Sequence, residues 1–174
     1  MDLGLFQGAW FAAVLGAANG MAWLGPAAVA VRLAVHLFWT DDRRGELRLA
    51  LAAGLLGLLF DTGMVAAGVF APLHHLAPHP ISPPWMVALW LNFAAALNGP
   101  LAWLRGRDLL GALFGALGGP LAYYAGATLG ATEGLPSGSG LLALAVGWAI
   151  MVPLLVRLAQ RLRGAGSRQA GPAS

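Results

Sequence analysis

The sequence predicts an all-α integral membrane protein, a bundle of six transmembrane helices with both termini in the cytoplasm. Three observations indicate this fold class. The chain of 174 residues is 59% hydrophobic and 10% charged, whereas a soluble domain carries about 25% charged residues. It contains six apolar segments close to the roughly 20 residues that span a bilayer. Arginine residues follow every second apolar segment, the alternation that the positive-inside rule describes.

Turn residues and short polar stretches separate the apolar segments. Asn19-Gly20 and Gly25-Pro26 divide the first long apolar run, and such Gly and Pro pairs are typical of turns. A charged stretch, 40–48, and a stretch rich in Pro and His, 71–84, end the next two segments. We therefore expect helices at about 4–21, 24–39, 47–70, 84–104, 108–131 and 140–162.

The arginine residues give the expected orientation. The loops after the first, third and fifth expected helices contain no arginine. Arginines lie at or after the ends of the other three helices: Arg43, Arg44, Arg48, Arg105, Arg107, Arg157, Arg161, Arg163 and Arg168. Because cytoplasmic loops carry the excess of arginine, we expect a multi-pass protein of the bacterial inner membrane. Residues 1–163 form one predicted domain, and the polar tail 164–174 is expected to be disordered.

Composition and motifs exclude several classes of function. The chain has no cysteine, which excludes disulfides and thiolate metal sites. Its pI is about 10.6, but the arginines gather at helix ends rather than along one stripe, so we expect no nucleic acid partner. The sequence has no nucleotide-binding glycine loop and no HExxH spacing. We therefore predict no catalytic residue, cofactor or metal ligand.

Asp61 lies in the middle of an apolar stretch, LLGLLFDTGMVAAGVF (55–70). It precedes Phe70 by nine residues, which places it ~13 Å inside the expected helix. A charge near the bilayer centre costs at least about 2.5–3.5 kcal/mol on insertion scales. We therefore expect Asp61 to face the interior of the bundle and to have a polar partner there.

Polar side chains on three other expected helices lie at a similar depth. Arg32, Asn92 and Tyr123 each lie eight residues from the outer end of their helix, or ~12 Å. We expect an ion pair between Arg32 and Asp61. The deeper tryptophans Trp90 and Trp148 are expected to line the interior, and one turn separates His36 from Arg32. The predicted ligand-binding residues are Arg32, His36, Asp61, Asn92, Tyr123 and Trp90.

This polar layer has more than one interpretation. It can join the helices structurally, or it can bind or transport a small polar, anionic or lipid-like ligand. Arg32 has five donors and Asp61 can occupy only some of them, which favours an anion. The alternative function is a membrane enzyme, or an enzyme accessory, that acts on acyl lipids with Asp61 or His36 as the acid–base group. A structural scaffold is a third hypothesis.

Prolines and small residues suggest how the helices pack. Pro100, Pro120 and Pro153 fall inside expected helices, where each frees one carbonyl group; this is compatible with a cavity, a hinge or a packing kink. Small residues recur every four positions in the first and fifth helices, at Ala9, Ala13 and Ala17 and at Gly111, Gly115 and Gly119. Such rows favour close packing within the bundle or a docking face for a membrane partner.

Four stretches resemble a bacterial membrane family known as domain of unknown function 2878: LFQGAWFAAVLGAA (5–18), LFDTGMVAAGVF (59–70), PPWMVALWLNFAAALNGPLAWL (83–104) and GALFGALGGPLAYYAGATLGA (111–131). The matching positions are Asp61, Trp85, Trp90, Gly119, Pro120, Tyr123 and Gly126, and the resemblance implies no catalytic role for them. In size and layout the chain is also similar to the substrate-binding subunits of vitamin importers, whose first helix docks a partner through a small-residue face.

Overall fold

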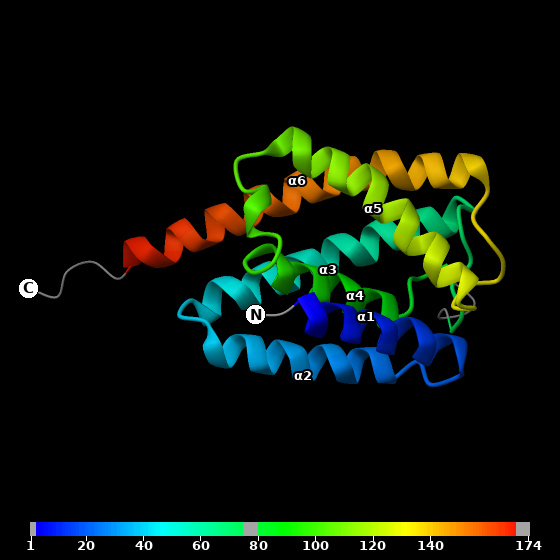
Figure 1. Ribbon diagram of the computed structural model, residues 1–174, viewed down its shortest axis with the longest axis horizontal. Helices are drawn as coiled ribbons and strands as arrows, with labels where there is room; N and C mark the ends of the chain where they lie inside the picture. The colour runs from blue at the N-terminus through cyan, green and yellow to red at the C-terminus, as the bar shows by residue number, and fades with distance from the viewer. Residues whose placement is uncertain (1–2, 75–79, 170–174) are drawn as a thin grey trace, which may run out of the picture.

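Six α-helices and one short 3₁₀ helix make up the protein in a computed structural model that describes residues 3–74 and 80–169 (Figure 1). The helices are α1 (Leu3–Ala18), α2 (Leu24–Trp39), α3 (Arg43–Ala66), α4 (Pro84–Leu97), η1 (Ala102–Leu104), α5 (Asp108–Thr128) and α6 (Gly138–Gln169). The described residues form no strand, and one isolated β-bridge joins Pro72 to Thr132 in the loops after α3 and α5. The predicted all-helical fold is confirmed.

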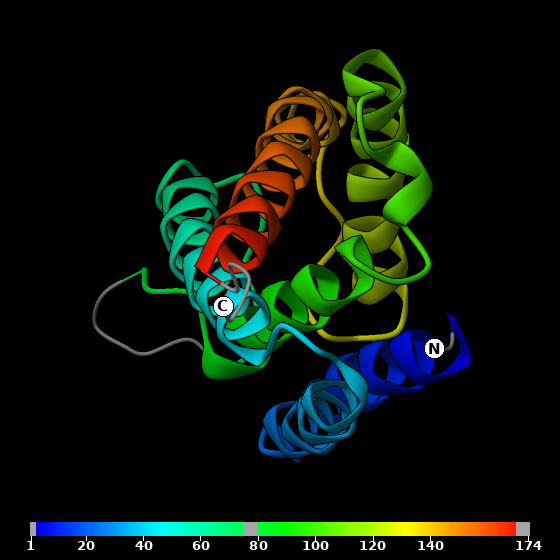
Figure 2. The same ribbon diagram turned by 90° about the vertical axis from the view of Figure 1, so that its left-hand side faces the viewer.

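Helix α4 lies at the centre of the bundle. It packs against α1, α2, α3 and α6, and ten of its 14 residues are buried. Two further pairs flank it, α1 with α2 and α5 with α6. Figure 2 shows α4 between the α1–α2 pair and α3. Although α2 and α3 are consecutive in sequence, each packs mainly against other helices.

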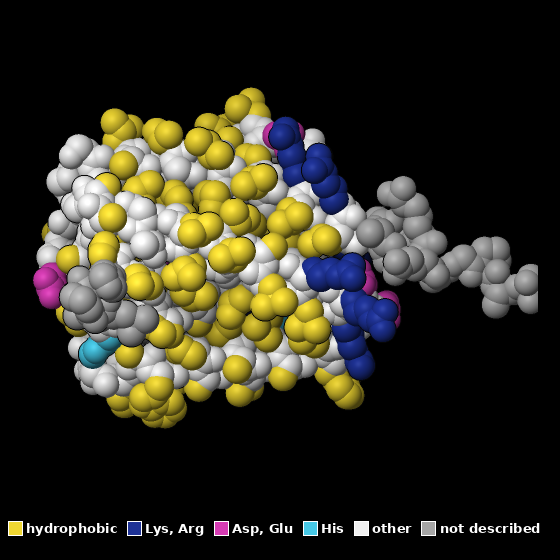
Figure 3. Space-filling model, turned by 180° about the vertical axis from the view of Figure 1, so that it is seen from behind, with side chains coloured by type: hydrophobic (Ala, Val, Ile, Leu, Met, Phe, Trp, Pro, Cys, Tyr) yellow, Lys and Arg dark blue, Asp and Glu magenta, His cyan; other side chains and the backbone are white. Residues whose placement is uncertain are grey.

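The surface and the helix lengths are those of a membrane-associated protein. By length and composition, α3, α5 and residues 138–163 of α6 are able to cross a membrane. The other three helices are apolar but shorter, with 14 to 16 residues each. Figure 3 shows arginine side chains gathered at one end of the molecule and hydrophobic side chains over its flank.

The structure corrects the predicted end of α4. The helix ends at Leu97, not at residue 104. Pro100 has no N–H and disfavours helical backbone at the residue before it. The carbonyl of Ala96 therefore accepts hydrogen bonds from the N–H groups of Gly99 (3.1 Å) and Leu101 (2.9 Å), and the chain turns into η1. Pro100 lies outside the helix, whereas Pro120 and Pro153 do lie inside α5 and α6.

Helix α3 begins and ends earlier than predicted. The Asp42 side chain accepts a hydrogen bond from the Gly45 N–H at 2.9 Å, an N-cap that starts the helix within the stretch expected to be a loop. The helix ends at Ala66, near Gly68 with its φ of 68°, a conformation that glycine adopts readily. Asp61 consequently lies five residues, or about 7.5 Å, from the end of its helix.

The remaining helix ends differ by a few residues. Helices α1 and α5 end at Ala18 and Thr128, each three residues before the predicted end, and Gly20 and Gly130 follow with positive φ. Helix α6 continues to Gln169, into the predicted tail. Residues 170–174 of that tail lie outside the described residues. The same holds for His75 and His79 of the stretch 71–84, which is rich in Pro and His.

The rows of small residues lie at helix contacts within the chain. Ala9, Ala13 and Ala17 are 5%, 0% and 0% exposed. A Cβ atom on Gly25 of α2 would lie 2.7 Å from Ala13, and one on Gly115 would lie 2.2 Å from the Trp148 carbonyl oxygen. These positions therefore permit the close approach of α1 to α2 and of α5 to α6.

Candidate functional site

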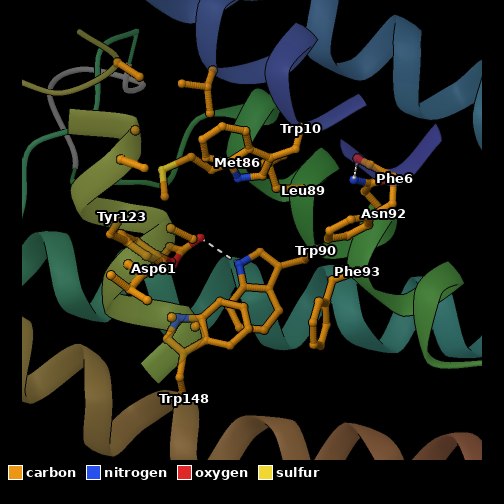
Figure 4. Close-up of a pocket in the computed structure, with 18 of the residues that line it drawn as sticks. Phe6, Trp10, Asp61, Met86, Leu89, Trp90, Asn92, Phe93, Tyr123 and Trp148 are labelled. Carbon is orange, nitrogen blue, oxygen red and sulfur yellow. Dashed lines mark hydrogen bonds between the residues drawn. The ribbon is translucent and has the colours of Figure 1, made fainter. Parts of the chain in front are cut away.

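Asp61 of α3 is fully buried and contacts side chains of α4 and α5. Its exposed fraction is 0%. The Trp90 indole N–H donates a hydrogen bond to Asp61 Oδ2 at 2.8 Å (Figure 4), and the Tyr123 hydroxyl donates to Oδ1. Gly57, one turn earlier in α3, allows this approach, because a Cβ there would lie 2.0 Å from the Trp90 ring. The carboxyl group is thus held by two neutral donors from two helices.

Aromatic rings surround this hydrogen-bonded group. The Trp90 and Trp148 rings stack with centroids 4.6 Å apart and an interplanar angle of 12°. Phe60 packs edge-on against both rings, at 5.7 Å and 6.3 Å. The Tyr123 ring lies 6.4 Å from that of Trp148. Edge-to-face and stacked pairs fix ring orientation, so Asp61 is surrounded by an ordered aromatic cluster.

A partly open cavity of about 480 Å³ lies beside this cluster. Its walls come from α1, α4, α5 and α6, while Asp61 is its one lining residue from α3. Figure 4 shows side chains of α1 and α4, including Trp10, Met86 and Leu89, above Asp61 and Tyr123. The volume lies within the range of about 300–1,000 Å³ that is typical of small-molecule pockets.

Glycine residues of α5 leave the cavity open. A Cβ atom on Gly118 or on Gly126 would meet no atom within 4 Å, although Gly126 is buried. Gly119, on the neighbouring face, packs against Trp148 instead, where a Cβ would lie 2.3 Å from the ring. Because α1 packs on α2 and α4 while α5 packs on α6, the open space lies between α1 and α5.

Asn92 places an acceptor at the cavity wall. Its exposed fraction is 1%, and its Nδ2 donates to the Phe6 carbonyl oxygen at 3.0 Å, which ties α4 to α1 (Figure 4). The Asn92 Oδ1 atom is buried and has no hydrogen-bond partner among the described residues. A buried polar atom without a partner is uncommon in native proteins, so Oδ1 is a place where a ligand can bind.

The expected ion pair between Arg32 and Asp61 is absent. Arg32 Nη1 donates instead to the Asn92 main-chain oxygen at 2.8 Å, and its guanidinium carbon lies 5.8 Å from the centre of the Phe6 ring. The ion pairs of the described residues do not include Arg32. The reason is geometric: α2 and α3 meet at His36 and Glu46, near their connecting loop, whereas Arg32 and Asp61 each bind α4 instead. Arg32 does not line the cavity.

His36 belongs to a separate polar network near the arginine-rich end. Its Nε2 lies 3.0 Å from Glu46 Oε2. Glu46, 7% exposed, also accepts from Asn98 Nδ2 at 2.9 Å, and Arg105 Nη2 donates to Asn98 Oδ1 at 3.1 Å. The sequence interpretation placed Glu46 in a solvated loop and missed this network. The loop between α2 and α3 is short and brings His36 and Glu46 together, so its length in the sequence could have indicated this contact.

The structure therefore divides the predicted site residues into two groups. Asp61, Trp90, Tyr123 and Asn92 line one cavity, whereas Arg32 and His36 do not. The sequence prediction missed several cavity residues that carry no charge: Phe6, Gln7, Trp10 and Phe114. Within residues 3–74 and 80–169, no group of three or more His, Asp or Glu side chains is arranged to hold a metal ion. The arrangement suits non-covalent binding of an apolar molecule with one polar end.

Comparison with known proteins gives a family. The family described as "Protein of unknown function (DUF2878)" matches residues 1–154, most of the chain. No curated protein and no solved structure matches the chain. The match confirms the resemblance carried by the four sequence stretches. The chain belongs to the family Protein of unknown function (DUF2878).

Proposed function

We propose that this chain is a multi-pass protein of the bacterial inner membrane that binds one lipid-like ligand in the cavity beside Asp61. All six helices cross or enter the bilayer in this proposal, with the arginine-rich end in the cytoplasm. The three shorter helices, at about 21–24 Å, fall short of a hydrocarbon core of about 30 Å. The short α4 is largely buried, and irregular backbone at its ends is tolerated where protein surrounds it.

One observation carries the proposal: the cavity is lined mostly by apolar side chains and has only a few polar groups. Its apolar walls include Phe11, Val14 and Leu121. Asp61, Tyr123 and the free Asn92 Oδ1 supply the polar contacts. A molecule with an apolar body and a single polar end fits this cavity, because its body contacts apolar side chains and its polar end can hydrogen-bond to the polar groups.

The position of the cavity favours access from the outer half of the bilayer. Asp61 and Tyr123 each lie five residues from the end of their helix that is remote from the arginine-rich end. The opening lies between α1 and α5, two helices whose outer surfaces are apolar: Leu5, Leu113 and Leu117 are 45%, 52% and 68% exposed. In the proposed membrane orientation, a lipid-soluble ligand reaches the cavity sideways without crossing water.

The geometry supports binding better than catalysis. The described titratable residues that line the cavity are Asp61 and Tyr123, and each is engaged by the other. His36, the second acid–base candidate of the enzyme hypothesis, is paired with Glu46 outside the cavity. A general acid–base mechanism needs a group within hydrogen-bond reach of the substrate, and His36 has no such access.

Filling the cavity tests the proposal. The Gly118→Leu variant introduces a side chain where a Cβ meets no neighbour, and Gly63→Leu is the matched control, because Gly63 is exposed, has open space and does not line the cavity. Native mass spectrometry of the purified proteins should show a small apolar molecule bound to the wild type and to Gly63→Leu, and absent from Gly118→Leu. Equal occupancy in all three, or none in any, would contradict the proposal.

A further inference from the structure

We infer that the ligand of this cavity carries a positively charged head group, an amine or a quaternary ammonium, on an apolar body. The inference rests on the proposed function and specifies its ligand. It comes from three features of the cavity: the charge of its lining, the aromatic rings around Asp61 and the unpartnered acceptor of Asn92.

The described lining contains a carboxyl group and no basic side chain. Among the described residues, the cavity is lined by one carboxyl group, that of Asp61, and by no Arg, Lys or His side chain. Asp61 is 0% exposed, and the described residues give it two neutral donors but no cation. A buried carboxylate is stabilised strongly by an opposite charge. A cationic head group in the cavity supplies the charge that the protein itself does not place there.

Aromatic rings make up much of the cavity lining. Four of the seven tryptophans line the cavity, together with Tyr123: Trp10, Trp85, Trp90 and Trp148. The face of an aromatic ring attracts a cation within about 6 Å of its centroid, and groups of such rings recognise quaternary ammonium ligands. Figure 4 shows Trp10 on one side of the space, with Tyr123, Trp90 and Trp148 on the other. An ammonium group placed between them lies beside Asp61.

The polar atoms of the cavity agree with this head group. Asn92 Oδ1 is a buried acceptor without a donor, and the N–H of an amine or the polarised methyl groups of a quaternary ammonium can approach it. This contact adds a polar interaction without requiring a second charge.

An anionic head group fits poorly. A carboxylate or phosphate would be buried beside the Asp61 carboxyl group, where the described lining offers no Arg, Lys or His side chain to pair with it. The sequence argument for an anion depended on the spare donors of Arg32. Arg32 lies outside the cavity and donates to the Asn92 main-chain oxygen.

The test compares four probes with the same twelve-carbon tail and different heads. The probes are dodecyltrimethylammonium, its uncharged isostere with a tert-butyl head, dodecanol and dodecanoate. Binding is measured by native mass spectrometry on the full chain in lipid nanodiscs, and Gly118→Leu gives the binding outside the cavity. We expect the ammonium probe to bind the wild type at least tenfold more tightly than the isostere. Asp61→Asn should remove that difference while dodecanol binding persists.

The outcomes separate this inference from the proposed function. If dodecanol or dodecanoate binds as tightly as the ammonium probe, and Gly118→Leu abolishes that binding, the cationic head group is wrong while the lipid-binding cavity stands. If no probe binds the wild type better than Gly118→Leu, both proposals fail. If Asp61→Asn does not fold, the ammonium probe and its isostere are compared on the wild type alone. Equal binding of the two probes there would overturn the cationic head group.

Discussion

Trp90 donates its indole N–H to Asp61 at 2.8 Å while its ring stacks on Trp148 at 4.6 Å. This relationship joins a buried carboxyl group of α3 to the central helix α4, and through the stacked ring to α6. The same indole also lies against Gly57, so neither partner can move without disturbing the contact between α3 and α4. We therefore expect Trp90 to orient Asp61 toward the cavity as well as to hold the helices together.

The Trp90→Phe variant tests this role. Phenylalanine keeps a ring in the stack but removes the donor, which leaves an oxygen of the fully buried Asp61 without one of its two partners. A lost hydrogen bond to a buried polar group reduces stability by about 1–3 kcal/mol. Unfolding of the purified protein in detergent should show a loss of this size. Trp23→Phe is the control, since Trp23 is 65% exposed, and an equal loss there would contradict the prediction.

The absence of an ion pair between Arg32 and Asp61 can be measured with a double-mutant cycle. Arg32 donates to the Asn92 main chain, whereas Asp61 accepts from the Trp90 and Tyr123 side chains, so the two share no hydrogen-bond partner. The effects of Arg32→Met and Asp61→Asn on the free energy of unfolding should therefore add to within about 0.5 kcal/mol. A coupling energy well above 1 kcal/mol would indicate that the charges meet.

His36 and Glu46 should behave in the opposite way. Their side-chain atoms lie 3.0 Å apart and both residues are buried. A cycle built from His36→Gln and Glu46→Gln should give a coupling energy within the range of about 0.5–3 kcal/mol that contacting residues show. Purely additive effects of the two substitutions would show that the pair contributes nothing to the joining of α2 and α3.

Two adjacent glycines of α5 should respond in opposite directions to alanine. At Gly119 a Cβ would lie 2.3 Å from the Trp148 ring, whereas at Gly118 it would meet nothing within 4 Å. Gly119→Ala should therefore destabilise by about 1–3 kcal/mol through overpacking. Gly118→Ala should stabilise by about 0.4–1 kcal/mol, because alanine favours the helix. Thermal unfolding of the two variants checks both signs; the same sign for both would contradict the cavity beside Gly118.

The number and type of the helices could be predicted from the sequence because they follow from local pattern. Apolar length and composition indicate each helix, and turn residues separate them. The helix ends were less accurate where a local interaction decided them. Pro100 ended α4 early through its missing N–H, and the Asp42 cap started α3 inside an expected loop.

The site could be predicted only in part because depth along a helix does not give direction around it. Counting residues placed Asp61, Asn92 and Tyr123 at related depths, and the structure brings them to one cavity. The same count placed Arg32 there wrongly, since nothing in the local sequence shows that its side chain binds α4 instead of α3. The sequence indicated Trp90 and Trp148 as interior residues, but it did not identify Trp10 as a cavity residue, because tryptophan is also expected at membrane interfaces.

An experimental structure with a marked probe tests the central claim most directly. The protein is crystallised with dodecyltrimethylammonium that carries bromine at the end of its tail, and anomalous scattering locates the bromine. The account predicts the tail between α1 and α5 and the ammonium group within about 6 Å of the Trp90 and Tyr123 ring centroids. A structure in which α1 packs directly against α5, with no space beside Asp61 and the probe only on the outer surface, would contradict it.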